Sequence, residues 1–332
     1  MDLVRASHLY KVFGKHEREV IERLKAGESR EDLASLGTAA VIDVSFEVAK
    51  AETFVVMGLS GSGKSTLIRM INGLWAPSEG TVEVAGKVVS DMNDAQLREL
   101  RRDHVSMVFQ HFALLPHLTV RENAAYGLKL QGRLKQKDRL EKANEWLHTV
   151  GLKGWGDKYP HQLSGGMQQR VGLARALAAE TDILLMDEAF SALDPLIRRE
   201  MQDQLLELQS TLNKTIIFIT HDLNEAMYLG DHIAVMRNGR VAQIGTSDEI
   251  LTQPADDYVA DFVQDVDRSR VLTASAVMRP TEAVVSGSAD PRRVQRIMDQ
   301  HDWVGVFVVD EHRRLLGMVC LLYTSDAADD SL

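Results

Sequence analysis

The sequence predicts an α/β fold built around a parallel β-sheet. Three continuous apolar runs, at 53–58, 182–187 and 215–220, have the length and composition of strands that are buried on both faces. Segments with helical spacing of apolar residues separate these runs, as crossover helices do in a parallel sheet. Apolar and polar residues alternate at 41–48 and 80–90, which predicts half-buried strands and hence a second, antiparallel β subdomain.

Length and charge limit the class of protein. A chain of 332 residues is expected to form two domains. The net charge of −10 argues against nucleic-acid binding, which normally needs a basic surface, so we expect no nucleic-acid partner. No apolar run approaches the roughly 20 residues that span a bilayer, and the first residues lack the apolar core of a signal peptide. The single cysteine allows no internal disulfide, which is typical of the cytosol.

Two stretches give local signals at the edges of the predicted sheets. A polar insertion between Phe13 and Val41 contains two short helical patterns, and Ser29 and Asp32 have the spacing of a capping box ahead of the second pattern. The dipeptide Asn238-Gly239 lies between apolar flanks and predicts a β-hairpin.

A glycine-rich loop directly follows the first buried run. The stretch GLSGSGKST fits the pattern G-x-x-x-x-G-K-[ST], whose backbone N–H groups cradle the phosphates of a nucleotide. Lys64 would reach the outer phosphates, and the Ser65 hydroxyl would ligate Mg²⁺. Alone, the pattern leaves kinases, GTPases and ATPases open. The residues expected to bind the nucleotide are Gly58, Ser60, Gly61, Gly63, Lys64, Ser65 and Thr66.

Ionisable side chains end the next two buried runs. Asp187 closes the run 182–187 and would hold Mg²⁺, because carboxylates are preferred ligands of that ion. Glu188 comes next and is placed to accept a proton from an attacking water. His221 follows the run 215–220, where its ring would reach the outermost phosphate. The combination predicts hydrolysis of a nucleoside triphosphate.

A second anion-binding helix start lies in LSGGMQQRVGLARALA, at 163–178. Ser164, Gly165 and Gly166 open a segment whose apolar residues keep helical spacing. Unpaired backbone N–H groups and the helix dipole meet at such a start and attract an anion. Since Lys64 already marks one phosphate site, this second site needs another explanation.

In their order and approximate spacing, these motifs resemble the nucleotide-binding subunit of an ABC transporter, over residues 9 to about 250. The resemblance makes Gln110 in MVFQ the Q-loop glutamine and Asp194 in SALD the D-loop aspartate. It makes Phe13 the aromatic residue that stacks on adenine. Met167 stands where many members have glutamine, which leaves the Ser-Gly-Gly helix start intact.

The resemblance implies an ABC-type P-loop NTPase fold with an antiparallel β subdomain and a helical subdomain at about 111–160. Two subunits would face each other head to tail, so that the signature of one covers ATP bound at Lys64 of the other. Each chain would thus need two anion sites. The implied roles are catalysis by Glu188, His221 and Gln110, Mg²⁺ binding by Ser65, Gln110 and Asp187, and contact with the partner's ATP by Ser164, Gly165, Gly166 and Asp194.

The chain is further similar to the ATPases of glycine betaine/proline uptake systems, in GLSGSGKSTLIRMINGL, in DEAFSALDPLIRREMQDQL and in the insertion before Val41. That subfamily carries tandem CBS motifs after its ATPase domain, and 273–319 has the CBS order of strand, helix, strand and strand. We expect an ATPase domain at 1–266 and a partial CBS domain at 267–319, a small truncated α+β unit. The tail at 320–332 resembles a translated sequencing adapter and is expected to be non-native.

A single CBS motif is expected to leave apolar side chains without their partner motif. Such a motif exposes a sheet face that a second motif would cover, and exposed apolar patches favour association. The residues expected to be partly uncovered are Val304, Val306, Val308, Leu315, Leu316 and Met318.

The family implies an ATPase that uses ATP and Mg²⁺ and works as a homodimer beneath two transmembrane permease subunits. It would be peripheral, on the cytoplasmic face of a bacterial or archaeal membrane, with a periplasmic or extracellular solute-binding protein as an indirect partner. Uptake is favoured over export because no transmembrane segment is fused to the ATPase.

Three alternatives remain open. In the first, the ATPase would power the uptake of another small solute, such as an amino acid or a polyamine, instead of glycine betaine, proline or choline. A non-transport ABC ATPase of DNA repair or translation would be expected to carry coiled-coil insertions or two ATPase domains, which this sequence lacks. A regulatory module without turnover would not need Glu188 and His221.

Overall fold

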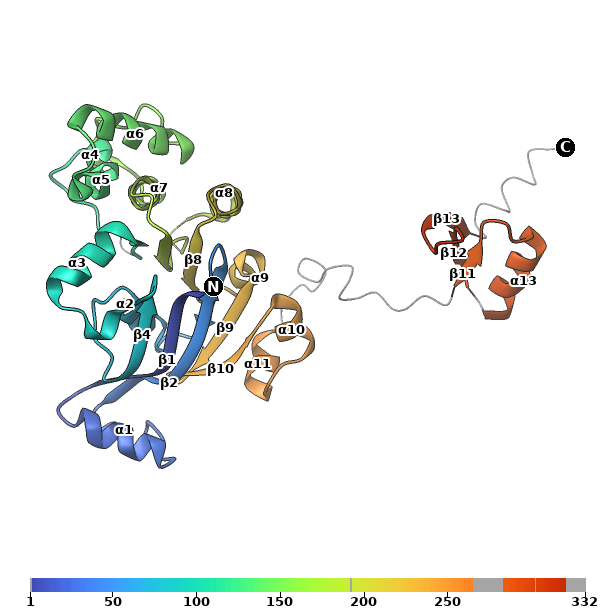
Figure 1. Ribbon diagram of the computed structural model, residues 1–332, viewed down its shortest axis with the longest axis horizontal. Coiled ribbons are helices and arrows are strands. Elements are labelled where there is room, and N and C mark those ends of the chain that lie inside the picture. The colour runs from blue at the N-terminus through green and yellow to red at the C-terminus, as the bar shows by residue number, and fades with distance from the viewer. Residues whose placement is uncertain (1, 111, 192, 265–282, 302, 321–332) are drawn as a thin grey trace. The chain divides into compact units, whose positions relative to one another are not determined.

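A computed structural model describes residues 2–110, 112–191, 193–264, 283–301 and 303–320 (Figure 1). The described residues form two compact units, one ending at residue 264 and one beginning at residue 283. The predicted domain boundary near residue 266 and most of the predicted tail, from residue 321 on, lie outside the described residues.

A mixed sheet at the centre of the first unit contains six described strands in the order β10-β9-β3-β8-β7-β6. Neighbouring strands run parallel except for β9 and β10, which form the hairpin predicted at Asn238-Gly239. The three apolar runs of the sequence are β3, β7 and β8, as predicted. The strands are β3 (Thr53–Gly58), β6 (Val105–Val108), β7 (Ile183–Asp187), β8 (Thr215–Thr220), β9 (His232–Arg237) and β10 (Arg240–Gly245).

Both faces of this sheet are buried, because successive residues of a strand point to opposite faces. Val55 and Met57 of β3 pack with residues of the helices α7, α8 and α9. Phe54 and Val56 pack with helix α2 and the antiparallel sheet. The helices beside the sheet are α2 (Lys64–Ile71), α3 (Asp94–Asp103), α7 (Gly165–Ala178), α8 (Pro195–Leu212), α9 (Leu223–Leu229), α10 (Ser247–Thr252) and α11 (Asp257–Phe262).

The predicted antiparallel β subdomain is present, with its described strands in the order β2-β1-β4-β5. The long strands β1 and β2 pair along most of their length. The run 80–90 is divided between β4, β5 and a short 3₁₀ turn. The elements are β1 (Asp2–Phe13), β2 (Thr38–Ala49), β4 (Glu79–Val84), β5 (Lys87–Val88) and η1 (Val89–Asp91).

The polar insertion forms one helix where two were predicted. Its first pattern is α1 (Glu17–Lys25), whose apolar side chains pack under β1. The prediction of a second helix was wrong, because residues 30–36 form turns. The cap itself exists, since the Ser29 hydroxyl accepts a hydrogen bond from the Asp32 backbone N–H at 3.2 Å. A segment this short makes too few backbone hydrogen bonds to offset the cost of starting an α-helix.

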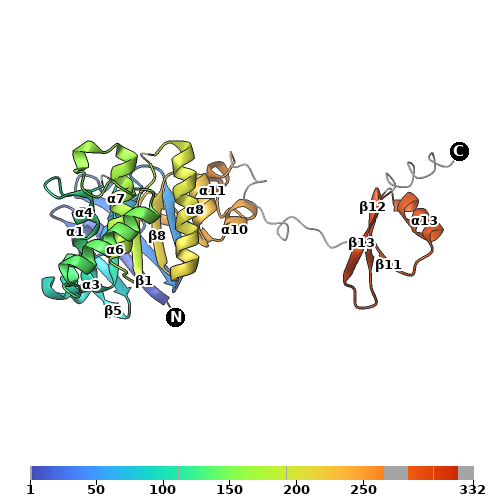
Figure 2. The same ribbon diagram turned by 90° about the horizontal axis from the view of Figure 1, so that it is seen from above.

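A helical layer lies beside the central sheet (Figures 1 and 2). It contains α4 (Val120–Ala124), α5 (Tyr126–Gln131), α6 (Gln136–Thr149) and the short turn η2 (Pro160–Gln162). Helices α4, α5 and α6 all pack against α7, so the helical layer continues past the predicted end at residue 160. The described residues contain no helix long and apolar enough to cross a membrane.

A buried asparagine fixes the start of this layer. Asn123 is fully buried, and its side chain bonds the backbone N–H and carbonyl of Leu115 and the carbonyls of Leu118 and Thr119. Because buried backbone groups need hydrogen-bond partners, these bonds hold the loop before α4 in one conformation.

The second unit contains a strand, a helix and two further strands, which matches the predicted order. They are β11 (Val284–Ser286), α13 (Pro291–His301), β12 (Gly305–Val309) and β13 (Leu315–Cys320). Helix α13 covers one face of the three described strands (Figure 2). Strand β13 runs through Cys320, one residue past the predicted end of the domain, and Cys320 pairs with Gly305. Assignment of this unit to the CBS family stays a prediction.

Only part of the expected apolar set of the second unit is uncovered. Val306 is fully buried against α13, contrary to the prediction, because α13 covers that side of β12. Val304, Leu315, Leu316 and Met318 are at least 60% exposed, as expected.

The turn from β3 into α2 has no room for side chains at two of its glycines. A Cβ atom on Gly58 would lie 2.2 Å from the carbonyl oxygen of Met236, and one on Gly63 would lie 2.2 Å from that of Ala40. Both glycines have positive φ angles, which other residues adopt at a cost. Gly61 also has a positive φ, but a Cβ there would meet no atom within 4 Å.

Replacing Gly63 by alanine should therefore destabilise the first unit much more than the same change at Gly61. The clash with Ala40 and the left-handed backbone together are worth about 3 kcal/mol, whereas Gly61→Ala carries only the backbone cost of about 1 kcal/mol. We expect Gly63→Ala to lower the melting temperature of the unit by about 6 °C or more, measured by thermal unfolding. Equal losses for the two variants would show that the contact with Ala40 does not constrain the turn.

Candidate functional site

A cavity of about 690 Å³ opens where β3, β7 and β8 end. Parallel strands bring their carboxyl ends to one edge of a sheet, which is where ligands bind in open α/β folds. Seven separate stretches of the sequence meet there. The cavity is lined by Phe13, Arg30, Thr38, Ala39, Ala40, Leu59, Ser60, Gly61, Gly63, Lys64, Ser65, Thr66, Gln110, Glu188 and His221.

The glycine-rich loop lines the floor of this cavity and leads into α2. The ammonium group of Lys64 donates hydrogen bonds to the carbonyls of Gly58 at 2.7 Å and Leu59 at 3.0 Å. Burial lowers the pKa of Lys64 below its ordinary value, and the Glu188 and Asp187 carboxylates oppose this effect. The helix cap is Gly63, whose lack of a side chain leaves the first N–H groups of α2 free to bind an anion.

A hydroxyl and a carboxylate meet beside Lys64. The Ser65 hydroxyl donates a hydrogen bond to the Asp187 carboxylate at 3.2 Å. Asp187 is only 3% exposed, and burial raises its pKa above the ordinary value, while the Ser65 hydrogen bond and nearby cations oppose the rise. Both groups are oxygen donors, the ligands that Mg²⁺ prefers.

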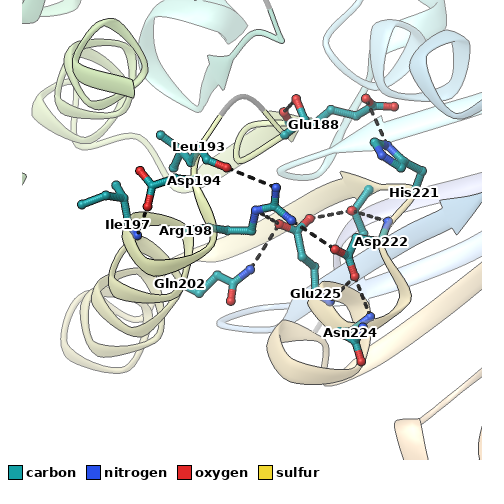
Figure 3. Close-up of polar contacts among 12 residues, drawn as sticks. Glu188, Leu193, Asp194, Ile197, Arg198, Gln202, His221, Asp222, Asn224 and Glu225 are labelled. Carbon is teal, nitrogen blue, oxygen red and sulfur yellow. Dashed lines mark hydrogen bonds and ion pairs between the residues drawn. The ribbon is translucent and has the colours of Figure 1, made fainter. Parts of the chain in front are cut away.

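The three predicted catalytic residues meet at the carboxylate of Glu188. Gln110 donates a side-chain hydrogen bond to it at 3.1 Å. The Nδ1 atom of His221 lies 3.3 Å from the same carboxylate (Figure 3). Glu188 has a φ of +48°, a strained conformation for this residue, held by a hydrogen bond from its N–H to the carbonyl of Ile219 at 3.0 Å. Such strain is maintained by surrounding structure and is typical of functional sites.

Phe13 presents an aromatic ring at the rim of the cavity. Phe13 is 38% exposed, and its ring makes an edge contact with Trp75, with 5.0 Å between the ring centres. The Lys11 ammonium lies 5.3 Å from the ring centre. Trp75 therefore holds an edge of the ring and Lys11 lies over it, while the exposed part of Phe13 is available for stacking.

The predicted signature residues form a second helix start. Ser164 caps α7 by accepting a hydrogen bond from the N–H of Met167 at 3.3 Å, and both Ser164 and Gly165 are exposed. A Cβ atom on Gly166 would lie 2.9 Å from the side chain of Leu193, so the D-loop packs against this turn. Among the described residues that line the Lys64 cavity, none belongs to the signature.

Asp194 begins α8, next to the signature turn. Its carboxylate accepts a hydrogen bond from the N–H of Ile197 at 3.1 Å (Figure 3). Asp194 is exposed and, like the signature, is absent from the described lining of the Lys64 cavity. The structure thus places the predicted residues in two groups, one around Lys64 and one around Ser164.

Sequence reasoning missed several residues that line the cavity. Thr38, Ala39 and Ala40 come from the start of β2, and Arg30 comes from the polar insertion. No motif spacing marks these positions, because they reach the cavity only through the pairing of β1 with β2 and the path of the insertion.

Comparisons with known proteins agree with this geometry. Residues 41–191 match the model of the ABC transporter family. The chain is 50% identical to the glycine betaine transport ATP-binding protein OpuAA of Bacillus subtilis, over 98% of this chain and 77% of that protein. It is 52% identical to the glycine betaine/carnitine transport ATP-binding protein GbuA of Listeria monocytogenes, over 96% of this chain and 81% of that protein.

A solved structure supports the same assignment. The fold matches the ATP-binding cassette MJ0796, solved as a dimer in a post-hydrolysis state bound to ADP and Pi, with a TM-score of 0.65 and 32% sequence identity. The match covers 74% of this chain and 98% of MJ0796. The cavity around Lys64, the motif order and these similarities lead to one conclusion: the chain belongs to the ABC transporter family, as an ATP-binding subunit that hydrolyses ATP.

Proposed function

We propose that this subunit hydrolyses ATP to power the uptake of a compatible solute of the glycine betaine, proline or choline type through separate membrane subunits. The observation that carries the ATPase part is the meeting of Gln110 and His221 at the carboxylate of Glu188, in the cavity that holds Lys64. The names of the two curated relatives, glycine betaine and glycine betaine/carnitine transport ATP-binding proteins, support the solute class.

ATP binding follows from the groups that line the cavity. The free N–H groups at the start of α2 and the Lys64 ammonium would bind the phosphates, which match them in charge and hydrogen-bonding capacity. To meet a phosphate, Lys64 exchanges its bonds to loop carbonyls for charge-assisted bonds, which are stronger. The ring of Phe13 at the rim would stack on adenine.

Mg²⁺ fits the oxygen donors beside the phosphate site. Ser65, Asp187 and Gln110 would hold it, directly or through water, since hydroxyl, carboxylate and amide oxygens are hard ligands. When bound, the ion would neutralise the charge that develops on the phosphates.

Glu188 is the proposed general base. Its carboxylate takes a proton from water as the water oxygen attacks the outermost phosphorus atom, and the bond to the ADP oxygen breaks. Gln110 and His221 orient this carboxylate and would contact the water and the phosphate. The products are ADP and phosphate.

A head-to-tail homodimer would explain the two groups of site residues. The turn at Ser164, Gly165 and Gly166 is an exposed helix start beyond the described lining of its own Lys64 cavity. The signature and Asp194 of one chain would cover ATP bound at Lys64 of the other. The structure of MJ0796, solved as a dimer bound to ADP and Pi, supports the formation of a dimer.

The proposed partners of this subunit are membrane proteins and, indirectly, a solute-binding protein. Two transmembrane permease subunits would contact the helical layer, so the ATPase would be peripheral on the cytoplasmic face of a bacterial or archaeal cell membrane. A periplasmic or extracellular solute-binding protein would act indirectly. An amino acid or a polyamine is the competing solute class, and a non-transport ABC ATPase is the more distant alternative.

Glu188→Gln should abolish turnover and preserve ATP binding. The amide cannot accept the proton, and loss of general-base catalysis lowers rates by about 100- to 10,000-fold. ATPase rate and ATP-dependent dimerisation should be measured together, and the variant should accumulate as an ATP-bound dimer. Glu207→Gln, on the exposed side of α8, is the matched control. Near-normal hydrolysis by Glu188→Gln would show that Glu188 is not the general base.

Lys64→Ala and Ser164→Arg should fail at different steps. Loss of the Lys64 charge should weaken ATP binding to the monomer by about tenfold or more, since hydrogen bonds to charged groups contribute about 1.5–3 kcal/mol. Ser164→Arg should leave that affinity within twofold yet block dimerisation, because its side chain would occupy the space of the partner's phosphate. Equal losses of monomer affinity, measured by calorimetry, would contradict the cross-subunit arrangement.

Reconstituted transport should discriminate among the solutes. The chain would be assembled in proteoliposomes with its permease subunits. ATP-dependent accumulation of labelled glycine betaine, proline, methionine and spermidine would then be compared. We expect accumulation of glycine betaine or proline, with methionine and spermidine at background. Preferential accumulation of methionine or spermidine would show that the subunit powers the uptake of an amino acid or a polyamine instead.

A further inference from the structure

One guanidinium group joins the D-loop to the segment that carries His221. Arg198, in the first turn of α8, donates a hydrogen bond to the carbonyl of Leu193 at 3.2 Å and another to the carboxylate of Asp222 at 3.2 Å (Figure 3). Asp222 directly follows His221. The side chain of Arg198 is only 27% exposed, so water screens these bonds less than it would on an open surface.

Hydrogen bonds hold the residues on both sides of His221. One carboxylate oxygen of Asp222 caps α9 by accepting from the N–H groups of Asn224 at 2.9 Å and Glu225 at 3.3 Å, and the other meets Arg198. The N–H of Asp222 donates to the Thr220 hydroxyl at 2.9 Å. The backbone at His221 therefore depends on where Asp222 and Thr220 are held.

Glu225 supplies a buried acceptor to this network. It is 5% exposed and accepts hydrogen bonds from the Thr220 hydroxyl at 2.6 Å and from Gln202 at 3.2 Å. Burial raises its pKa above the ordinary value, while the Thr220 hydrogen bond opposes the rise. The Arg198 guanidinium, 3.8 Å away, also favours the charged form of this carboxylate.

One nitrogen atom of the Arg198 guanidinium group makes no hydrogen bond with the described residues. Its buried Nε atom has no hydrogen-bond partner among the described residues, and a carboxylate oxygen of Glu225 lies 3.8 Å away. A hydrogen bond of ordinary length would need a shift of less than about 1 Å. The guanidinium is planar and rigid, so a displacement of Leu193 changes its bonds on the other side as well.

We propose that Arg198 is a positioning residue for hydrolysis, which couples the D-loop at Leu193–Asp194 to His221 and, through His221, to Glu188. The inference rests on the proposed function, because it takes the D-loop to face the partner's ATP and Glu188 to be the base. Arrival of the partner subunit at the D-loop then sets the position of His221 against Glu188, 3.3 Å away.

Arg199 provides a matched comparison on the same helix. Its guanidinium lies 3.5 Å from the ring centre of Tyr228 on α9 and 3.5 Å from the carboxylate of Asp203. It therefore joins α8 to α9 as Arg198 does, but no described contact links it to the D-loop or to residues 220–222. If Arg198 did no more than join α8 to α9, removal of either charge would have similar effects on kcat.

The test uses the full chain, under conditions where the unaltered protein forms dimers and hydrolyses ATP. Arg198→Met removes the guanidinium at similar length. Asp222→Asn keeps the cap of α9, since asparagine is also a good helix cap, but sets an amide N–H₂ against Arg198. We expect each variant to lower kcat by about tenfold, which corresponds to about 1.4 kcal/mol, with the KM for ATP within twofold. Arg199→Met should stay within twofold in both constants.

The double variant Arg198→Met/Asp222→Asn distinguishes a shared path from separate effects. Because both changes break the same connection, the double variant should lose no more than about tenfold in kcat, whereas independent effects would multiply. Unchanged kcat in either single variant, multiplying losses, or an equal loss in Arg199→Met would overturn the proposal. Glu188→Gln distinguishes failure of the Arg198 role from failure of the proposed ATPase mechanism. If Glu188→Gln is inactive and Arg198→Met is fully active, only the role of Arg198 is wrong.

Discussion

The parallel pairing of β3, β7 and β8 is the constraint on which the rest of the structure depends. Their register brings three strand ends to one edge of the sheet, where the loop before Lys64, the acidic pair Asp187 and Glu188, and His221 come together. Each strand is fully buried, so a shift of register would move polar ends into the core. Hydrophobic burial of the strands thus holds these polar and ionisable groups in place.

The same arrangement explains why one chain carries two helix starts that suit an anion. The start of α2 lies in the Lys64 cavity, whereas the start of α7 lies against the D-loop and faces outward. In the proposed head-to-tail dimer, a subunit built this way would supply half of each of two ATP sites. The network around Arg198 lies between these halves, because it touches the D-loop on one side and the segment of His221 on the other.

Much of this fold could be predicted from the sequence, because its signals are strong and local. Continuous apolar runs correctly predicted β3, β7 and β8. Motif spacing singled out Lys64, Asp187 and Ser164, whose roles stay predictions. The prediction of a second helix in the insertion was wrong, because a segment of one short turn does not offset the cost of helix initiation. Arg30 and Arg198 were missed, since their contacts depend on how distant segments pack and leave no periodic pattern.

The central claim is that ATP held at Lys64 of one subunit is covered by Ser164 of another. A structure of the Glu188→Gln chain with ATP and Mg²⁺ tests it most directly. The account predicts a dimer in which the Ser164 hydroxyl and the N–H of Gly166 lie within hydrogen-bond distance of the outermost phosphate bound to the other copy's Lys64. A structure in which each copy's own signature contacts its own ATP, or in which ATP binds a monomer without any signature contact, would contradict it.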